Sequence, residues 1–249
     1  MSSFFAGLAY PFRALGTIQR STGLWLYILA PILINIVVGA ALYAGLLTAG
    51  FAQIETLISG LPEWAQGTAW LLRGLLAILL FVAVGYLLVR FGVVLGSPFY
   101  GQLSERLEHQ LTGSAPPAEP LSALGILRDI SRSLLYELKK LALVLMIGLP
   151  LLLLGFLPVV GQIAGLIGQI ALGALITCLD FIDSPLERRR LRFREKLVAI
   201  RKALPVTAGF GLICLGLVSL PLINLLAIPL CVVAGTLLFC ERLRPSTNL

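Results

Sequence analysis

The sequence predicts an all-α integral membrane protein with two long transmembrane helices, two Pro-interrupted helical hairpins and amphipathic cytoplasmic helices. Of its 249 residues, 58% are hydrophobic and only 12% are charged, whereas an ordinary soluble domain carries about 25% charged residues. Three long stretches, 21–54, 141–179 and 203–240, contain no charged residue. Because a spanning helix needs about 20 residues, each of the last two stretches is long enough for a hairpin. Their continuous Leu, Ile and Val runs lack the alternation of a transmembrane barrel.

The same composition excludes a water-soluble enzyme, a collagen and a disordered chain. The net charge of +7 does not indicate nucleic-acid binding, because the basic residues flank apolar segments and so set membrane topology. All four cysteines lie in apolar stretches and form no CxxC pair, which favours buried, reduced thiols.

The first half of the chain contains an interfacial segment and the two long spans. Residues 1–20 are expected to form a short amphipathic helix at the membrane interface. Its apolar side consists of Phe4, Phe5, Leu8 and Phe12. The two long spans together cover residues 23–95, and Pro31 in the first span removes one backbone donor and marks a kink. A short acidic connection, 55–63, joins the spans.

The polar middle segment, residues 96–140, is predicted to lie on the cytoplasmic side as two amphipathic helices. Gly96-Ser97-Pro98 is expected to end the second span, and a turn over 112–120, rich in Pro and small residues, separates the two helices. Leucines at helical spacing on both sides of this turn predict one apolar face for each helix.

The two remaining apolar blocks, 141–179 and 204–240, are similar to each other. Because their limbs are shorter than a full span of about 20 residues, each block is predicted to be a hairpin that barely crosses the bilayer or turns back within it. Paired, Pro-interrupted apolar segments also indicate a transport site. Each block has a Leu-Pro step near its middle, followed by a side-chain amide: Leu157-Pro158 with Gln162, and Leu220-Pro221 with Asn224.

The distribution of charge predicts the orientation of this single membrane domain, 1–249. The connection 55–63 carries only acidic residues, whereas residues 1–20 and the basic loop 180–203 carry an excess of Lys and Arg. By the positive-inside rule, both termini, the segment 96–140 and the basic loop face the cytoplasm.

Residues 97–113, SPFYGQLSERLEHQLTG, carry a more specific signal. This stretch resembles the signature of the CysZ-type sulfate permeases, in which a small-Pro-Phe-Asn element precedes a Leu-x-Glu-x-x-Glu helix. It departs from the signature at Tyr100, which stands in place of the Asn. Further matches keep the order and approximate spacing of that family: Ala30-Pro31-Ile32-Leu33-Ile34-Asn35, Leu157-Pro158-Val159-Val160-Gly161-Gln162, Asp183-Ser184-Pro185 with Phe193-Arg194-Glu195, and Pro221-Leu222-Ile223-Asn224-Leu225.

The resemblance implies a bacterial inner-membrane protein with two full-length helices and two hemi-penetrating hairpins, assembled into homo-oligomers. It also implies a permease or channel that conducts sulfate inward for cysteine biosynthesis, and it implies no cofactor.

The start of the first long helix departs from the family pattern. In the sulfate permeases this helix opens with a Gly-Leu-Arg-Arg element whose basic pair resembles a sulfate site. The matching residues here are Gly23, Leu24, Trp25 and Leu26, so both arginines are absent. Arg20, three residues before Gly23, is expected to substitute for them in part. We expect substrate binding at Gly23, Leu24, Trp25 and Arg20, where free backbone amides after Gly23 and the helix dipole attract an anion. Trp25 is alternatively an interfacial anchor.

Six polar residues are candidates for lining the route: Asn35, Glu105, Arg106, Glu108, Gln162 and Asn224. The amides either join helices by hydrogen bonds or line an aqueous path. The charged residues belong either to a solvated cytoplasmic helix or to the inner mouth of the pathway. The cluster Arg188-Arg189-Arg190 is expected to set topology and to bind lipid headgroups.

Catalysis is not expected from this sequence. His109 is the only histidine, so no zinc site is predicted, and there is no GxxxxGK[ST] motif for an ATP-driven pump. Three functions remain open: a sulfate permease, a permease for another solute, and a structural protein whose hairpins wedge one leaflet. The expected partners are a small inorganic anion, membrane lipids and further copies of the chain.

Overall fold

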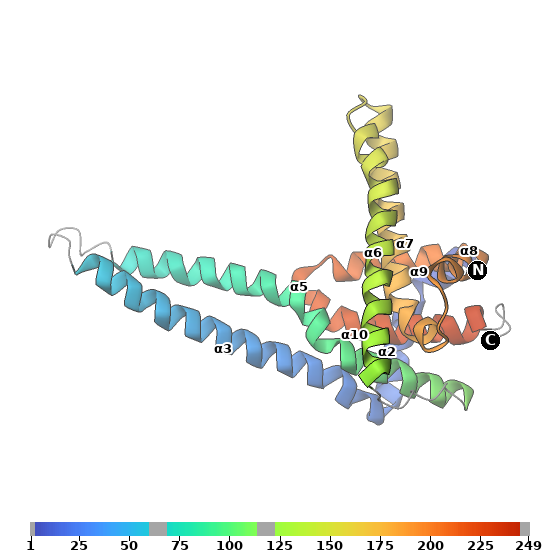
Figure 1. The fold of residues 1–249 in the computed structure, drawn as a ribbon, viewed down its shortest axis with the longest axis horizontal. Helices are drawn as coiled ribbons and strands as arrows, with labels where there is room; N and C mark the ends of the chain where they lie inside the picture. Colours follow the sequence, from blue (N-terminus) through green and yellow to red (C-terminus); the bar gives the residue numbers. More distant parts are fainter. Residues whose placement is uncertain (1–2, 60–68, 114–122, 245–249) are drawn as a thin grey trace. The chain divides into compact units, whose positions relative to one another are not determined.

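The computed structural model describes residues 3–59, 69–113 and 123–244, which form helices joined by short turns (Figure 1). No strand occurs among these residues, so the prediction of an all-α protein is confirmed. In chain order the helices are α1 (Ser3–Leu8), α2 (Tyr10–Arg20), η1 (Thr22–Leu24), α3 (Trp25–Ile58), α5 (Ala69–Thr112), α6 (Ala123–Leu154), α7 (Val160–Arg188), α8 (Phe193–Lys202), α9 (Val206–Val218), α10 (Pro221–Leu238) and η2 (Phe239–Leu243).

Three helices in the described part of the chain are long and apolar enough to cross a membrane: Thr22–Thr56, Val160–Arg188 and Ile223–Leu243. Helices α8 and α9 pass the same test together but meet at 107°, which is the geometry of a broken span or a re-entrant loop. These helices make the chain an integral membrane protein, as the sequence predicts.

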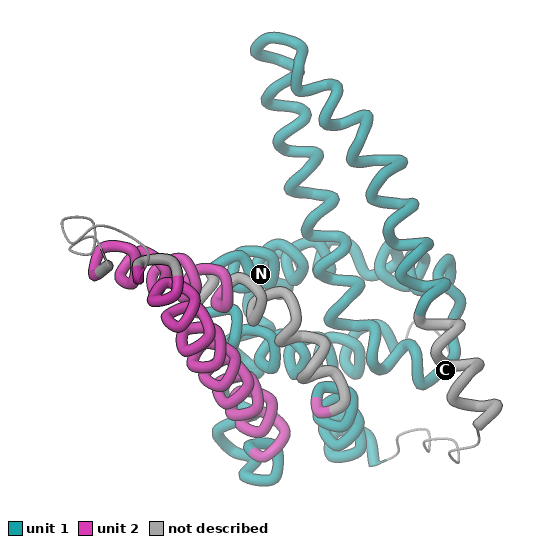
Figure 2. The backbone as a smooth tube through the Cα atoms, turned by 60° about the vertical axis from the view of Figure 1, so that its left-hand side comes forward, with its two compact units in different colours: residues 1–25, 100–249 teal, residues 26–99 magenta. Residues whose placement is uncertain are grey.

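The chain divides into two compact units, residues 1–25 with 100–249 and residues 26–99 (Figure 2). In the smaller unit, α3 lies beside the first part of α5. Tyr43 joins them, because its hydroxyl donates a 3.1 Å hydrogen bond to the carbonyl oxygen of Ala77 and its ring meets that of Phe81 edge-on. Polar contacts of this kind hold helices together in lipid, which provides little hydrophobic driving force between them.

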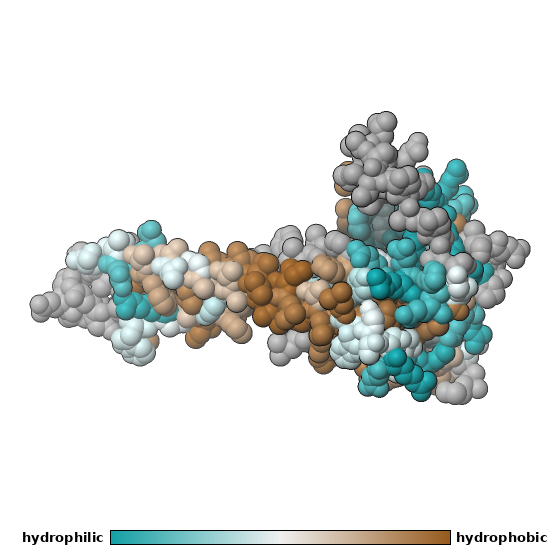
Figure 3. Space-filling model, turned by 90° about the horizontal axis from the view of Figure 1, so that it is seen from below, coloured by the Kyte–Doolittle hydropathy of each residue, from teal (hydrophilic) through white to brown (hydrophobic). Residues whose placement is uncertain are grey.

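The surface of α3 is apolar over most of its length. Figure 3 shows this region as a brown stretch that ends in hydrophilic residues. The large apolar side chains that α3 exposes are Leu26, Leu29, Leu33, Ile36, Val37, Leu42 and Leu46. Helix α3 also extends into the predicted acidic connection, because Glu55 lies in its last turns and forms a 2.8 Å ion pair with Arg73 of α5. Residues 60–68 of that connection lie outside the described residues.

Both predicted hairpins are present in the larger unit. Helices α6 and α7 lie side by side and are joined by a turn over 155–159 that contains Leu157-Pro158. Gln169 of α7 donates a 2.8 Å hydrogen bond to the carbonyl oxygen of Gly148 in α6. In the second hairpin, α9 ends at Val218 and α10 begins at Pro221.

Glycines bring α9 and α10 into backbone contact with their neighbours. A Cβ atom on Gly209 would lie 2.2 Å from the carbonyl oxygen of Phe4 in α1, and one on Gly211 would lie 2.1 Å from that of Ala174 in α7. Gly235 of α10 approaches α7 in the same way. Small residues permit this close packing of helices within membranes.

The N-terminal segment forms two helices, α1 and α2, rather than the single helix predicted for residues 1–20. Phe5 and Phe12 of the predicted apolar side are 58% and 70% exposed. The opposite side is buried against α9 and α10, with Gly7 and Tyr10 among its residues. The segment therefore has an exposed aromatic side and a side that packs within the larger unit.

The predicted break at the start of the middle segment is wrong, because α5 continues through 96–98 to Thr112. At the other end of the segment, α6 runs from Ala123 past Leu141 into the first hairpin. A proline removes only one amide donor, and each further backbone bond broken in lipid is costly, so the helix continues. The predicted turn begins at Gly113, and residues 114–122 lie outside the described residues.

Gly211→Ala is expected to lower the free energy of unfolding by about 1–3 kcal/mol, because the new Cβ would meet the carbonyl oxygen of Ala174. Gly216→Ala in the same helix is the matched control, since a Cβ there meets nothing within 4 Å. Alanine is also the better helix former, so the control should be neutral or slightly stabilising. Unfolding of the detergent-solubilised variants measures the difference. Equal stability of the two would contradict close packing between α7 and α9.

Candidate functional site

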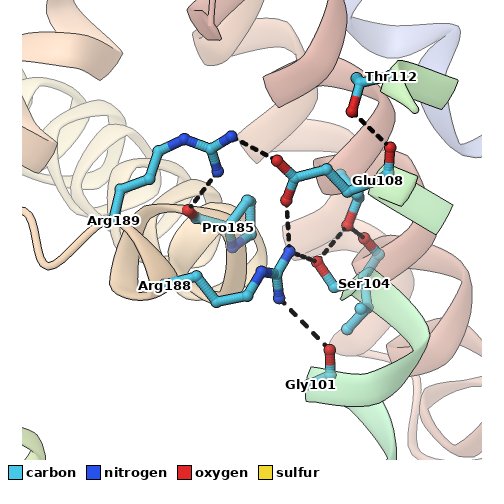
Figure 4. A network of polar contacts seen from close by, with 9 residues as sticks. Gly101, Ser104, Glu108, Thr112, Pro185, Arg188 and Arg189 are labelled. Atoms are coloured by element: carbon cyan, nitrogen blue, oxygen red, sulfur yellow. Dashed lines mark hydrogen bonds and ion pairs between the residues drawn. The ribbon is translucent and has the colours of Figure 1, made fainter. Parts of the chain in front are cut away.

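A buried carboxylate connects the last turns of α5 to the C-terminal end of α7 (Figure 4). Glu108 is fully buried. Its Oε2 accepts a 2.7 Å hydrogen bond from Nη2 of Arg188, and its Oε1 accepts one from Nη2 of Arg189. The two arginine side chains are only 16% and 8% exposed. One carboxylate thus holds two guanidinium groups, and these three residues carry a net positive charge.

Hydroxyl groups and an aromatic ring complete this arrangement, which we call the Glu108 cluster: Ser104, Glu108, Arg188, Arg189, Thr236 and Phe239. Nη2 of Arg188 also donates a 3.1 Å hydrogen bond to Oγ of Ser104, which is hydrogen-bonded to Oγ1 of Thr236 at 2.9 Å. The guanidinium group of Arg189 lies 4.6 Å from the ring centroid of Phe239. The cluster therefore joins α5, α7, α10 and η2.

Local structure positions the charged members of the cluster and Ser104. Ser104 and Glu108 are four residues apart on α5 and so lie on one face of that helix. Arg188 is the last residue of α7, and the amide of the next residue, Arg189, donates a 3.2 Å hydrogen bond to the carbonyl oxygen of Leu186. Basic side chains at a helix C-terminus are favoured by the helix dipole.

Burial and charge act on Glu108 in opposite directions. Burial alone would raise the pKa of this carboxyl group, but hydrogen bonds from Arg189 and Arg188 and the charges of both groups outweigh burial. The pKa of Glu108 is therefore held below the ordinary glutamate value, and the group is ionised at neutral pH.

A second charged cluster ties α8 to α7. Lys196 is 1% exposed, and its Nζ donates to Oδ1 of Asp183 at 2.6 Å and to Oε2 of Glu187. The same ammonium group lies 4.4 Å from the ring centroid of Tyr136 in α6. Here two carboxylates hold one cation, which is the reverse of the balance in the Glu108 cluster.

The predicted substrate site at the start of α3 is a short 3₁₀ turn, η1, that leads directly into α3. Gly23 and Trp25 are exposed, as is Arg20 at the end of α2, whereas Leu24 is buried. The amides of Leu24 and Trp25 donate to carbonyl oxygens of the preceding turn. The prediction that these two amides are free is therefore wrong. Open space does surround Gly23, since a Cβ there would meet nothing within 4 Å.

The six predicted pathway residues lie on four helices. Asn35 of α3 and Asn224 of α10 are buried, whereas Gln162 near the start of α7 is exposed. Nδ2 of Asn35 donates a 2.8 Å hydrogen bond to the carbonyl oxygen of Pro31, four residues earlier in the same helix. On α5, Glu105 is half-buried and Arg106 is exposed, so Glu108 is the buried member of this charged group.

Arg188 and Arg189 were predicted to set topology and to bind lipid headgroups, and the structure corrects the prediction of lipid contact for these two residues. Both side chains are directed into the protein toward Glu108 (Figure 4). Lys196 was not singled out at all. No short-range pattern reveals these pairs, because Arg188 and Glu108 lie 80 residues apart in the sequence.

The fold and the buried charged groups define a polytopic α-helical membrane protein. Over residues 10–229 the chain matches the family described as Sulfate transporter CysZ/Etoposide-induced protein 2.4, and it belongs to that family. The match includes the first hairpin and most of the second, and it confirms the resemblance drawn from residues 97–113.

Glu108→Ala is expected to lower the free energy of unfolding by about 3–5 kcal/mol, because it leaves two buried guanidinium groups without a counter-charge. Glu241→Ala is the matched control. Glu241 accepts hydrogen bonds from Arg13 and from the hydroxyl group of Tyr10, both in α2. Because the side chains of Arg13 and Glu241 are 51% and 37% exposed, the loss of the ion pair and of the tyrosine hydrogen bond should together cost about 1–2 kcal/mol. Denaturant unfolding in detergent measures both variants, and equal losses would contradict the central role of Glu108.

The stabilisation by Glu108 should depend on pH. Because folding lowers the pKa of this group, its contribution is complete above the ordinary glutamate pKa and is lost as the pH falls through the lower folded value. The stability difference between the unaltered chain and Glu108→Gln should therefore shrink between pH 7 and about pH 3. A difference that stays constant over this range would contradict an ionised Glu108.

Proposed function

We propose that this protein is a permease or channel for a small inorganic oxyanion, and that sulfate taken up through it supplies cysteine biosynthesis. The observation that carries the proposal is the family match over residues 10–229, since the family description names a sulfate transporter. The proposal includes a homo-oligomer in the bacterial inner membrane with both termini in the cytoplasm, the side on which the positive-inside rule places the basic segments.

The short and broken helices support a route across a thinned part of the bilayer. Helix α9 has 13 residues and is therefore about 20 Å long, which is less than the roughly 30 Å of a hydrocarbon core. Helices α8 and α9 meet at 107°. Helix ends at membrane depth are the elements from which broken-helix transporters build their ion and substrate sites.

In this proposal the anion meets the start of α3 at Gly23, Leu24, Trp25 and Arg20. The exposure of Gly23 and Arg20 and the open space around Gly23 support this position. The proposal also keeps the six polar residues as candidates for lining the route: Asn35, Glu105, Arg106, Glu108, Gln162 and Asn224. Because uncharged Trp25 and Leu26 stand in place of the family's basic pair, Arg20 and the helix dipole supply the attraction for the anion.

Uptake of labelled sulfate into proteoliposomes tests the proposal. We expect protein-dependent uptake that excess sulfite reduces and that phosphate at the same concentration leaves unchanged. Uptake of a different anion without sulfate uptake would contradict sulfate as the substrate but would still support a permease or channel. Ion-tight vesicles with altered curvature would instead favour a membrane-shaping protein, because the tip of the first hairpin exposes Phe156 and Val160 at 79% and 77%.

Gly23→Asp tests the position of the substrate site. A negative charge there should reduce sulfate uptake about tenfold, because repulsion of this size at close range corresponds to roughly 1.4 kcal/mol. Gly23→Asn is the matched control, because its side chain has nearly the same size as that of Asp and carries no charge, and a Cβ at Gly23 meets nothing within 4 Å. Equal uptake by the two variants, in correctly inserted protein, would place the substrate site elsewhere.

A further inference from the structure

The Glu108 cluster holds more positive charge than its carboxylate neutralises. Each oxygen of Glu108 accepts a hydrogen bond from a different guanidinium group, that of Arg188 or that of Arg189. Paired arginines bind phosphate-like and sulfate-like groups through the same kind of charged contact. A carboxylate balances one of the two positive charges, whereas a divalent oxyanion would balance both.

One donor in the cluster also lacks an acceptor. The Nε atom of Arg188 is buried and has no hydrogen-bond partner among the described residues. Both oxygens of Glu108 already accept hydrogen bonds from Nη2 atoms. A tetrahedral oxyanion presents more oxygens than a carboxylate does, and a buried donor without a partner is costly. The unpaired Nε is therefore a second observation that indicates a ligand with more acceptors than Glu108 offers.

The other charged contacts of the larger unit do not share these features. Glu241 binds the single guanidinium group of Arg13 through both of its oxygens, so that pair is balanced and largely exposed. Lys196 is held by two carboxylates, so its surroundings repel anions. Among these contacts, the excess of positive charge is confined to the Glu108 cluster.

We propose that Arg188 and Arg189 form a binding site for a divalent tetrahedral oxyanion, and that Glu108 occupies this site in the structure. The anion and the Glu108 carboxylate then compete for the same pair of guanidinium groups. The hydroxyl group of Ser104, 3.1 Å from Nη2 of Arg188, borders the site. This inference rests on the oxyanion transport proposed above and names the residues that bind the anion at the α5–α7 contact.

Rescue of Glu108→Ala by added anions tests the inference. The substitution removes the carboxylate and leaves space beside both guanidinium groups. Sodium sulfate should raise the unfolding midpoint of the detergent-solubilised variant in a saturable manner, whereas sodium chloride at the same ionic strength should not. Sodium formate, which replaces the lost carboxylate, serves to show that the space is accessible. Half-saturation by sulfate should occur at about tenfold lower concentration than in the unaltered chain, the factor that one charge-assisted hydrogen bond supplies.

Matched variants separate a bound anion from a general salt effect. Glu241→Ala also frees an arginine, and its response to sulfate should be no larger than that of the unaltered chain. Adding Arg188→Gln and Arg189→Gln to Glu108→Ala should abolish the saturable response. Rescue by formate alone, equal rescue by chloride and sulfate, or rescue by no anion would each overturn the inference.

A second variant covers the case in which Glu108→Ala does not accumulate. Glu108→Gln is nearly the same size, and equilibrium dialysis with labelled sulfate should show tighter binding to it than to the unaltered chain. Equal or weaker binding would overturn the inference. Sulfate uptake by the unaltered chain is measured separately. If sulfate stabilises Glu108→Ala but the unaltered chain takes up no sulfate, the proposed transport function is contradicted and the anion site is supported. If the unaltered chain takes up sulfate but sulfate does not stabilise the variant, the anion site is contradicted and the transport function is supported.

Discussion

The approach of α9 and α10 to the backbone of α7 is the contact on which the larger unit depends. Gly211 meets the carbonyl oxygen of Ala174, and Gly235 meets that of Phe181, seven residues further along α7. Two helical turns separate these carbonyl groups, so both glycines contact the same side of α7. Lipid provides no hydrophobic drive for such contacts, and close packing of small residues replaces it. The end of α7 is thereby held beside α10, where Arg188 and Arg189 meet residues of α5 and η2.

The end of α7 also gathers much of the charge in a chain that has little of it. Over its last turns the helix changes from apolar residues such as Cys178 to a run of acidic and basic ones, beginning at Asp180. Asp180 pairs with Lys140 of α6 at 2.9 Å, and Asp183 pairs with Lys196 of α8. Pairing reduces the cost of charges that lie close to an apolar region. The charged groups therefore connect helices at the level where α7 leaves its apolar section.

Local signals made much of the fold predictable. Continuous apolar stretches predicted the helices, and the Leu-Pro steps at Leu157-Pro158 and Leu220-Pro221 predicted both hairpin turns, because a proline after a hydrophobic run disfavours continued helix in most settings. The same rule was misleading at Gly96-Ser97-Pro98, where α5 continues. The difference depends on what surrounds the backbone, and that information is not local.

The candidate site was less accessible to prediction for a related reason. Glu108 is identifiable from its motif, but its partners lie 80 and 81 residues away, and nothing in the spacing of Arg188 and Arg189 distinguishes a buried arginine from one at a lipid surface. The prediction of unpaired amides after Gly23 was wrong, because the amides of Leu24 and Trp25 donate hydrogen bonds within the turn η1. The hydrophobic pattern of the sequence predicts where helices lie. It does not predict the hydrogen bonds that determine the turn at the start of a helix.

Topology and binding place different demands on Arg188 and Arg189, and the two demands are compatible. The positive-inside rule acts on unpaired charges while a chain is inserted, so in the proposed orientation these arginines contribute before α5 and α7 have packed. Once the helices meet, Glu108 neutralises one of the two charges and leaves the other. A fully neutral cluster would be easier to bury, because an unbalanced charge in a low-dielectric region is costly. The ring of Phe239, 4.6 Å from the Arg189 guanidinium group, offsets part of this cost, and the remaining positive charge is consistent with the anion site proposed above.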